Sequence, residues 1–249
     1  MLETNVTTAN RRFIGQSDVG LLRSVNQDSY YVDEEAGRFF IVADGMGGHA
    51  GGQEASQIAV EQISRYLQEH WETDLPTPEL LQQAILTANQ GILADQDSHP
   101  ERGDMGTTVV LIAFRHDGNW RAHIGDSRLY CFRQGQLLQV TEDHTWVARA
   151  LKMGDLEPDQ IKTHPWRHVL FQCLGRQDLA EAEVGILDVK TGDVFLLCSD
   201  GLTEEVEEAM ISEILQVTSE PERIAEALIE AAKAGGGSDN ITVILVCQD

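Results

Sequence analysis

The chain has few basic residues and no long apolar run, and each shortage excludes a class of protein. Among its 249 residues, 18 are Lys or Arg against 41 Asp or Glu, so the formal net charge is −23. Because so acidic a protein repels polyphosphate and anionic lipid, we expect no nucleic-acid partner and no membrane partner. The longest apolar runs, 39–43 and 109–114, are much shorter than the ~20 residues that span a bilayer.

Cysteines are also few, and they form no metal-binding or catalytic motif. Cys131, Cys173, Cys198 and Cys247 are far apart, and no two of them form a C-x-x-C pair, which excludes a cysteine zinc site. No arginine follows a cysteine six positions later, so the loop of the cysteine phosphatases is absent. The polar first ten residues do not resemble a secretory leader. We therefore expect buried, reduced thiols in a cytoplasmic protein.

The hydrophobic pattern predicts one α+β domain at 12–249 after a flexible tail at 1–11. Short turns such as Asp117-Gly118 separate successive strand patterns, which indicates antiparallel sheets. We expect Thr77 to cap a helix and Ser219–Glu222 to form a capping box. The expected strands are 12–19, 29–33, 38–43, 107–114, 119–125, 128–133, 136–140, 181–188, 193–198 and 241–247, and the expected helices are 55–67, 77–92, 203–216 and 222–234.

Five aspartates stand where these strands begin or end. Asp44, Asp126 and Asp200 each follow an apolar strand, whereas Asp28 and Asp239 come just before one. One such aspartate is a common turn residue, but the ends of packed strands converge, so five carboxylates can share one end of the core. Two carboxylates ~4 Å apart repel by ~4 kcal/mol at an effective dielectric of 20, so protons or a cation must offset the charge. An all-oxygen ligand set suits Mg²⁺ or Mn²⁺.

Histidines and glycines near the aspartates give weaker indications. The eight histidines form no H-E-x-x-H motif, and His49 and His123 lie closest in sequence to the aspartate motifs. The glycine-rich stretch 45–52 suggests a phosphate cradle, but no Gly-Lys-Ser/Thr follows, which argues against a nucleotide P-loop.

Five segments resemble, in order, the motifs of the protein phosphatase 2C family, the metal-dependent serine/threonine phosphatases. They are 20–28 (GLLRSVNQD), 42–49 (VADGMGGH), 125–128 (GDSR), 199–202 (SDGL) and 238–243 (SDNITV). The resemblance extends from about residue 12 to 248, and the chain is most similar to the small stand-alone bacterial members. Within the family it looks most like the cyanobacterial phosphatases that act on the phosphorylated PII nitrogen-signalling protein.

This resemblance implies a four-layer α-β-β-α sandwich, in which two antiparallel sheets pack face to face with helix pairs outside. It also implies that a water or hydroxide bridging two metal ions attacks phosphoserine or phosphothreonine, without a covalent intermediate. The implied roles are phosphate binding for Arg23; metal ligation for Asp44, the carbonyl of Gly45, Asp200 and Asp239; action through a metal-bound water for Asp28; and, for Asp126 with Asp200, a third and weaker ion.

The resemblance leaves two features open. Animal members carry a histidine, the proposed general acid, directly after the Asp-Gly of the second motif, and here that residue is Met46. The leaving-group proton must then come from a metal-bound water or another donor, for which His49 is a candidate. The irregular stretch 145–170 corresponds to a mobile flap beside the active site, and we expect it to select protein substrates.

Three function classes remain open at this point. The first is a phosphoprotein phosphatase of signal transduction, the second a metal-dependent hydrolase of small phosphorylated metabolites, and the third a catalytically silent binding module on the same fold. Family members that lose metal aspartates become such modules, whereas all five aspartates are present here. We therefore expect a cytoplasmic, monomeric phosphatase whose partner is a phosphorylated protein.

Overall fold

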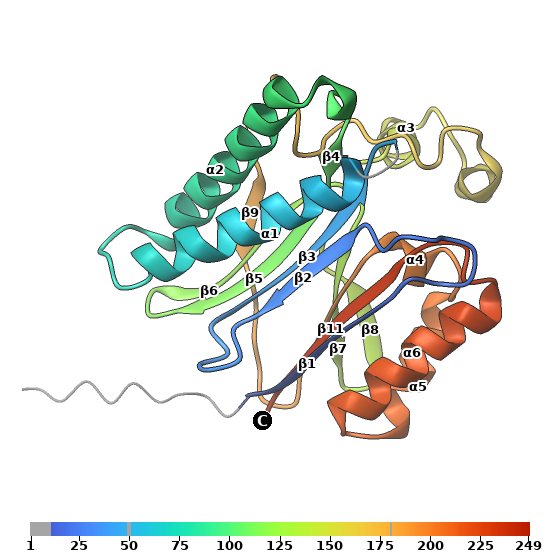
Figure 1. Ribbon diagram of the computed structural model, residues 1–249. Helices are drawn as coiled ribbons and strands as arrows, with labels where there is room; N and C mark the ends of the chain where they lie inside the picture. Colours follow the sequence, from blue (N-terminus) through green and yellow to red (C-terminus); the bar gives the residue numbers. More distant parts are fainter. Residues whose placement is uncertain (1–10, 49–50, 180) are drawn as a thin grey trace, which may run out of the picture.

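Two antiparallel sheets pack face to face, and helices cover the outer face of each (Figure 1). The computed structural model describes residues 11–48, 51–179 and 181–249. This arrangement confirms the predicted α-β-β-α sandwich. Residues 1–10 of the predicted tail lie outside the described residues, and Arg11 already belongs to the first strand.

Each sheet has a simple order of strands. The first sheet runs β1-β11-β10-β7-β8, with β1 at Arg11–Asp18, β11 at Ile241–Gln248, β10 at Val194–Cys198, β7 at Arg128–Arg133 and β8 at Gln136–Gln139. The second runs β2-β3-β5-β6-β9, with β2 at Asp28–Val32, β3 at Phe39–Met46, β5 at Val109–Arg115, β6 at Gly118–Ile124 and β9 at Glu183–Ile186; the short β4 at Gly106–Thr107 pairs with β3.

The helices fall into two covering groups and a flap. The second sheet is covered by α1 (Gly51–His70) and α2 (Thr77–Ser98), after which η1 (Pro100–Arg102) leads back to β4. The first sheet is covered by α4 (Asp200–Thr203), α5 (Glu208–Val217) and α6 (Pro221–Gly235). The flap holds α3 (Trp146–Met153) and η2 (Pro158–Thr163), and Figure 1 shows it at one end of the sheets.

Strand β3 illustrates why the core strands read as continuous apolar runs. Phe39 and Ile41 pack against α1 and α2, whereas Phe40 and Val42 point into the space between the two sheets. A strand buried on both faces needs apolar residues at every position, since successive side chains alternate between the faces. The run ends where the chain leaves the core, and Asp44 follows directly.

Both predicted helix caps are wrong. Pro76 is the N-cap of α2, and Thr77 is its first residue; the backbone N–H and hydroxyl of Thr77 both donate to the Asp117 carboxylate. Glu220 is the N-cap of α6 and makes no side-chain cap hydrogen bond, so the capping box at Ser219–Glu222 does not form. At Thr77 a contact outside the helix takes up the groups that would cap it, and at Glu220 the carboxylate makes no capping hydrogen bond.

The single helix predicted at 203–216 is divided into α4 and α5. The chain between them is held by the segment that follows α6, because Ser238 donates its backbone N–H to Oε1 of Glu205 at 3.1 Å. A Cβ on Gly235 would lie 2.7 Å from the Glu205 carbonyl oxygen, so this close approach requires glycine. Propensity alone favours helix through this run of glutamates, and the tertiary contact overrides it.

The state of the cysteines and the character of the helices agree with what the sequence predicts. All four cysteines are free; Cys173 is half-buried and the other three are buried. Over the part of the chain that the structure describes, no helix combines the length and the apolar character needed to cross a bilayer.

Candidate active site

The predicted aspartates meet at the end of the sandwich beside the flap (Figure 1). Asp28 and Asp44 are paired directly across β2 and β3. Asp200 begins α4 immediately after β10, and the charges of Asp28, Asp200 and Asp126 all raise the pKa of the Asp44 carboxyl, after burial itself. Strand ends from both sheets therefore bring these carboxylates together, as the sequence predicts.

Asp28 is held by two hydroxyl groups from the opposite sheet. Its Oδ2 accepts hydrogen bonds from Ser199 Oγ and Thr242 Oγ1, each at 2.7 Å. Burial, followed by the charges of Asp200 and Asp239, raises the pKa of Asp28 to about 7 despite these two donors. The hydroxyls fix the orientation of the carboxylate, which leaves Oδ1 for a different partner.

Backbone and hydroxyl contacts fix the segment around Asp44. The Asp44 N–H donates to Thr108 Oγ1 at 3.0 Å, and its carbonyl accepts from Thr107 Oγ1 at 2.8 Å. A Cβ on Gly45 would lie 2.0 Å from the Gly52 carbonyl oxygen and 2.5 Å from that of Gln27, so only glycine fits here. The start of α1 can therefore pack directly on the end of β3.

Asn240 joins the Asp239 segment to the loop between β1 and β2. Its Oδ1 accepts from the Gln27 N–H at 2.7 Å, and its Nδ2 donates to the carbonyls of Val19 and Val25. Through this junction the loop places Arg23 beside the cluster, and Arg23 Nη2 lies 2.7 Å from Oδ2 of Asp239. Asp239 is thus the carboxylate at the edge of the site that faces the predicted phosphate-binding arginine.

Asp126 lies near Asp200, and burial together with the charge of Asp200 raises the pKa of Asp126. The alternative to metal binding is that Asp126 caps its own turn and pairs with Arg128. The structure instead pairs Arg128 with Asp143, with Nε–Oδ1 at 2.9 Å and Nη2–Oδ2 at 2.7 Å. Arg128 is therefore already neutralised, and Asp126 remains available to the cluster.

This donor set fits divalent cations. Among the described side chains, the few buried polar atoms without a hydrogen-bond partner include Oδ1 of Asp28 and Oδ1 of Asp200. Orphaned buried oxygens and raised carboxyl pKa values both mean that positive charge is needed between the carboxylates. Because the donors are all oxygens, Mg²⁺ or Mn²⁺ is the suitable ion, and zinc or copper is not.

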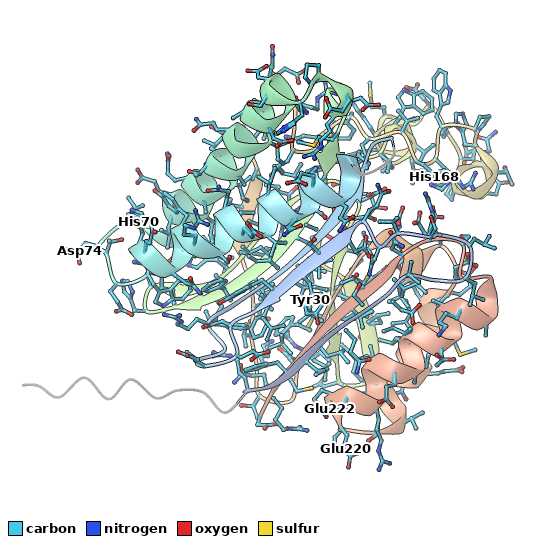
Figure 2. The ribbon with its side chains drawn as sticks, viewed as in Figure 1. Tyr30, His70, Asp74, His168, Glu220 and Glu222 are labelled. Carbon is cyan, nitrogen blue, oxygen red and sulfur yellow. The ribbon has the colours of Figure 1, made fainter. Side chains whose placement is uncertain are left out.

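Sequence reasoning missed one contact between the flap and the site. His168 Nδ1 lies 2.7 Å from Glu204 Oε1, and ligand atoms of His168, Glu204 and Asp200 lie within 4.8 Å of one another. Figure 2 shows His168 between the flap and α4. Burial and the charge of Asp200 raise the pKa of Glu204 to about 7. The spacing of Asp200 and Glu204, four residues apart, is a signal that Glu204 joins Asp200 on one face of a helix, but the sequence holds no signal for His168.

Of the two histidines singled out from the sequence, only His123 is described by the structure, and it does not join the carboxylate cluster. His49 lies outside the described residues. His123 is fully buried, its Nε2 faces the Glu142 carbonyl at 2.9 Å, and its ring stacks on His144 with centroids 4.5 Å apart. Burial lowers the pKa of His123, which is therefore a neutral packing residue.

Comparisons with known proteins agree with the fold. The family model described as protein phosphatase 2C matches residues 23–231. The serine/threonine protein phosphatase PstP of Mycobacterium tuberculosis is 37% identical over 237 residues, which is 94% of this chain and 44% of PstP. The serine/threonine phosphatase Stp of Listeria monocytogenes is 36% identical over 242 residues, 94% of each chain. The chain thus spans less than half of PstP but nearly all of Stp.

Solved structures give the same result. The crystal structure of M. tuberculosis PstP superposes with a TM-score of 0.88 at 36% identity and covers 96% of this chain and 99% of that one. A PstP catalytic domain in complex with two manganese ions gives a TM-score of 0.83 at 34% identity, covering 95% and 97%. The chain belongs to the protein phosphatase 2C family, which confirms the family predicted from the five motifs.

Proposed function

We propose that this protein is a metal-dependent phosphatase that hydrolyses phosphoserine and phosphothreonine in proteins. The observation that carries the proposal is the cluster of five aspartates with two orphaned oxygens, next to an arginine at its edge. The named activity of PstP and Stp, both serine/threonine phosphatases, supports it. The PstP catalytic domain with two manganese ions supports the metal requirement.

The carboxylates would divide the ions among them. Asp44 and the Gly45 carbonyl, with Asp200 and Asp239, would hold two core ions; Asp28 would act through a bound water; and Asp126 with Asp200 would hold a third, weaker ion. When bound, such ions lower the pKa of water and neutralise charge on the phosphoryl group. The hydroxyls of Ser199 and Thr242 keep Asp28 in one orientation throughout.

Arg23 supplies positive charge at the edge of this site that faces Asp239. Its planar guanidinium matches two oxygens of a phosphate group, and half of its side chain is exposed, so a substrate can reach it. We expect water to attack the phosphorus directly, so that no phosphoenzyme forms. Met46 carries no proton donor, and the proposed role of His49 in protonating the leaving group stays untested because His49 is outside the described residues.

The flap favours a protein substrate over a small metabolite. Trp166 is 53% exposed and Val169 48%, although both are large and apolar, and their segment is tied to the site through His168 and Glu204. Exposed apolar groups beside a catalytic centre are suited to contact with another protein surface. The particular substrate we propose is the phosphorylated PII signalling protein, supported by the resemblance of the motifs. We further propose a monomer in the cytoplasm, where the four thiols would stay reduced.

The test is turnover of p-nitrophenyl phosphate with and without metal. Activity should require Mn²⁺ or Mg²⁺ and should vanish in EDTA, and Asp44→Ala and Asp200→Ala should both be nearly inactive. Asp74→Ala is the matched control, because Asp74 is exposed between α1 and α2 at the opposite end of the molecule (Figure 2). Full activity in chelator would contradict the proposal.

A second assay separates the substrate classes. Rates on a phosphoprotein, a phosphopeptide and a sugar phosphate should fall in that order. Preference for the sugar phosphate would favour the metabolite hydrolase, and no turnover of any ester would favour the silent binding module. For the particular substrate, phosphorylated PII should be hydrolysed faster than an unrelated phosphoprotein at equal concentration.

A further inference from the structure

The loop between β1 and β2 presents apolar side chains to solvent next to Arg23. We propose that this loop, residues 19–25, is a docking surface for apolar residues that flank the phosphorylated residue of a protein substrate. The proposal rests on the proposed function, because it takes Arg23 as the phosphate ligand, and it adds a sequence preference to that function.

The exposure of this loop is unusual for its composition. Leu22 is 74% exposed, Leu21 59%, Val25 43% and Val19 36%. Four of the seven residues are thus large, apolar and in contact with water, and the single cation among them is Arg23. Singly exposed apolar residues are common on protein surfaces, whereas several in one short segment indicate a site of contact.

The backbone of the loop is fixed. The N–H groups of Leu21 and Leu22 donate to the Gly237 carbonyl at 2.7 and 3.3 Å. Asn240 Nδ2 donates to the carbonyls of Val19 and Val25 at 2.9 and 3.0 Å. The apolar side chains of the loop are therefore exposed on a backbone that hydrogen bonds hold in place. Such a pre-organised surface loses little conformational entropy on binding.

The loop also lies directly on the site. Gly20 has φ +78°, and a Cβ there would lie 2.2 Å from the Asp239 carbonyl oxygen, so only glycine allows this approach. Arg23 reaches the Asp239 carboxylate at 2.7 Å. Leu22 precedes Arg23 in the chain, and an extended peptide spans about 3.3–3.6 Å per residue, so residues that flank a phosphoresidue held by Arg23 can reach the loop that carries Leu22.

A phosphorylated peptide segment is the occupant that fits both features. The negative phosphate of the peptide complements the positive charge of Arg23. The side chain before or after the phosphoresidue lies within reach of Leu22. A small phosphate ester has no group to place on this surface. An apolar flanking residue would remove Leu22 from water, whereas a polar one would gain nothing there.

The test pairs two phosphothreonine peptides with two protein variants. The peptides are identical except that leucine or glutamine stands on both sides of the phosphothreonine. The unaltered protein should show a kcat/KM about fivefold to tenfold higher for the leucine peptide. Leu22→Ser should reduce this ratio to about one, and Leu22→Met should retain it. The matched control is Val217→Ser, because Val217 is 82% exposed at the end of α5 and should leave the ratio unchanged.

Each outcome is decisive. Equal kcat/KM for both peptides in the unaltered protein, or a ratio that survives Leu22→Ser, would overturn the docking surface while leaving the phosphatase in place. A concentration-dependent dimer by light scattering that Leu22→Ser abolishes would assign the loop to a second copy of the chain instead. Lack of turnover of either peptide and of p-nitrophenyl phosphate with Mn²⁺ would defeat the proposed function itself.

Discussion

Replacing Arg23 by alanine should weaken phosphate binding about tenfold while the fold and the metals remain. A hydrogen bond to a charged group contributes ~1.5–3 kcal/mol. In the free protein, however, Arg23 Nη2 already lies 2.7 Å from Asp239, so an incoming phosphate must replace or share that contact. The net loss therefore falls near the lower limit, ~1.5 kcal/mol, which corresponds to about a tenfold rise in KM.

Stability should change little in the same variant. Half of the Arg23 side chain is exposed, as is 29% of the Asp239 side chain, and exposed ion pairs typically contribute only ~0–1 kcal/mol to folding. Removing the arginine also leaves Asp239 without its cation, so the affinity for Mn²⁺ should be no weaker. Metal binding by calorimetry and unfolding in urea measure these two quantities.

The kinetic assay is the initial rate on p-nitrophenyl phosphate across a range of substrate concentrations. Arg23→Lys is the control, because it keeps the positive charge and removes the planar fork, and its KM should fall between the other two. An unchanged KM in Arg23→Ala would mean that the arginine does not bind the phosphate. A loss of metal affinity would mean that it acts through Asp239.

Three further predictions concern the metals, pH and the flap. Asp126→Ala should fold and still bind two Mn²⁺ ions, but its kcat should fall at least tenfold, or ~1.4 kcal/mol; a normal kcat would return Asp126 to a role in its turn. The metal-free protein should resist urea better at about pH 6 than at pH 8: the folded pKa of Asp28, about 7, exceeds its ordinary value of 3.8, so the folded state takes up a proton as pH falls. The opposite trend would place Asp28 in a better-solvated or neutralised position. Trp166→Ala should slow phosphoprotein turnover several-fold more than turnover of the aryl phosphate, and equal losses would mean that the flap supports the fold.

The positions of the strands and aspartates could be predicted because both follow from local pattern. A strand such as β3, buried on both faces, must be apolar throughout, so the first charged residue after it marks the end of the core. Five such ends, taken with the resemblance, predict a shared site. The contact that replaces a cap at Thr77 and the break of the helix at Glu205 could not be predicted, because residues 40 and 33 positions away make them.

The residues that hold the site carboxylates in place could not be predicted from the sequence either. Ser199 and Thr242 lie within recognisable motifs, but nothing in their spacing shows that both hydroxyls meet on one oxygen of Asp28. The contact of His168 with Glu204 depends on the path of the flap, which has little periodicity to predict it. Long-range hydrogen bonds of this kind become visible only in three dimensions.

The assembly of the site from both ends of the chain affects when activity can begin. Arg23 and Asp239 are 216 residues apart in the sequence, and Asp28 and Thr242 are 214 apart. Contacts of such separation form late in folding, because the intervening chain must first be ordered. During synthesis, β11 must emerge from the ribosome before Asp28 can acquire its second hydroxyl donor. A nascent chain therefore carries most of the clustered carboxylates long before the cluster can be completed.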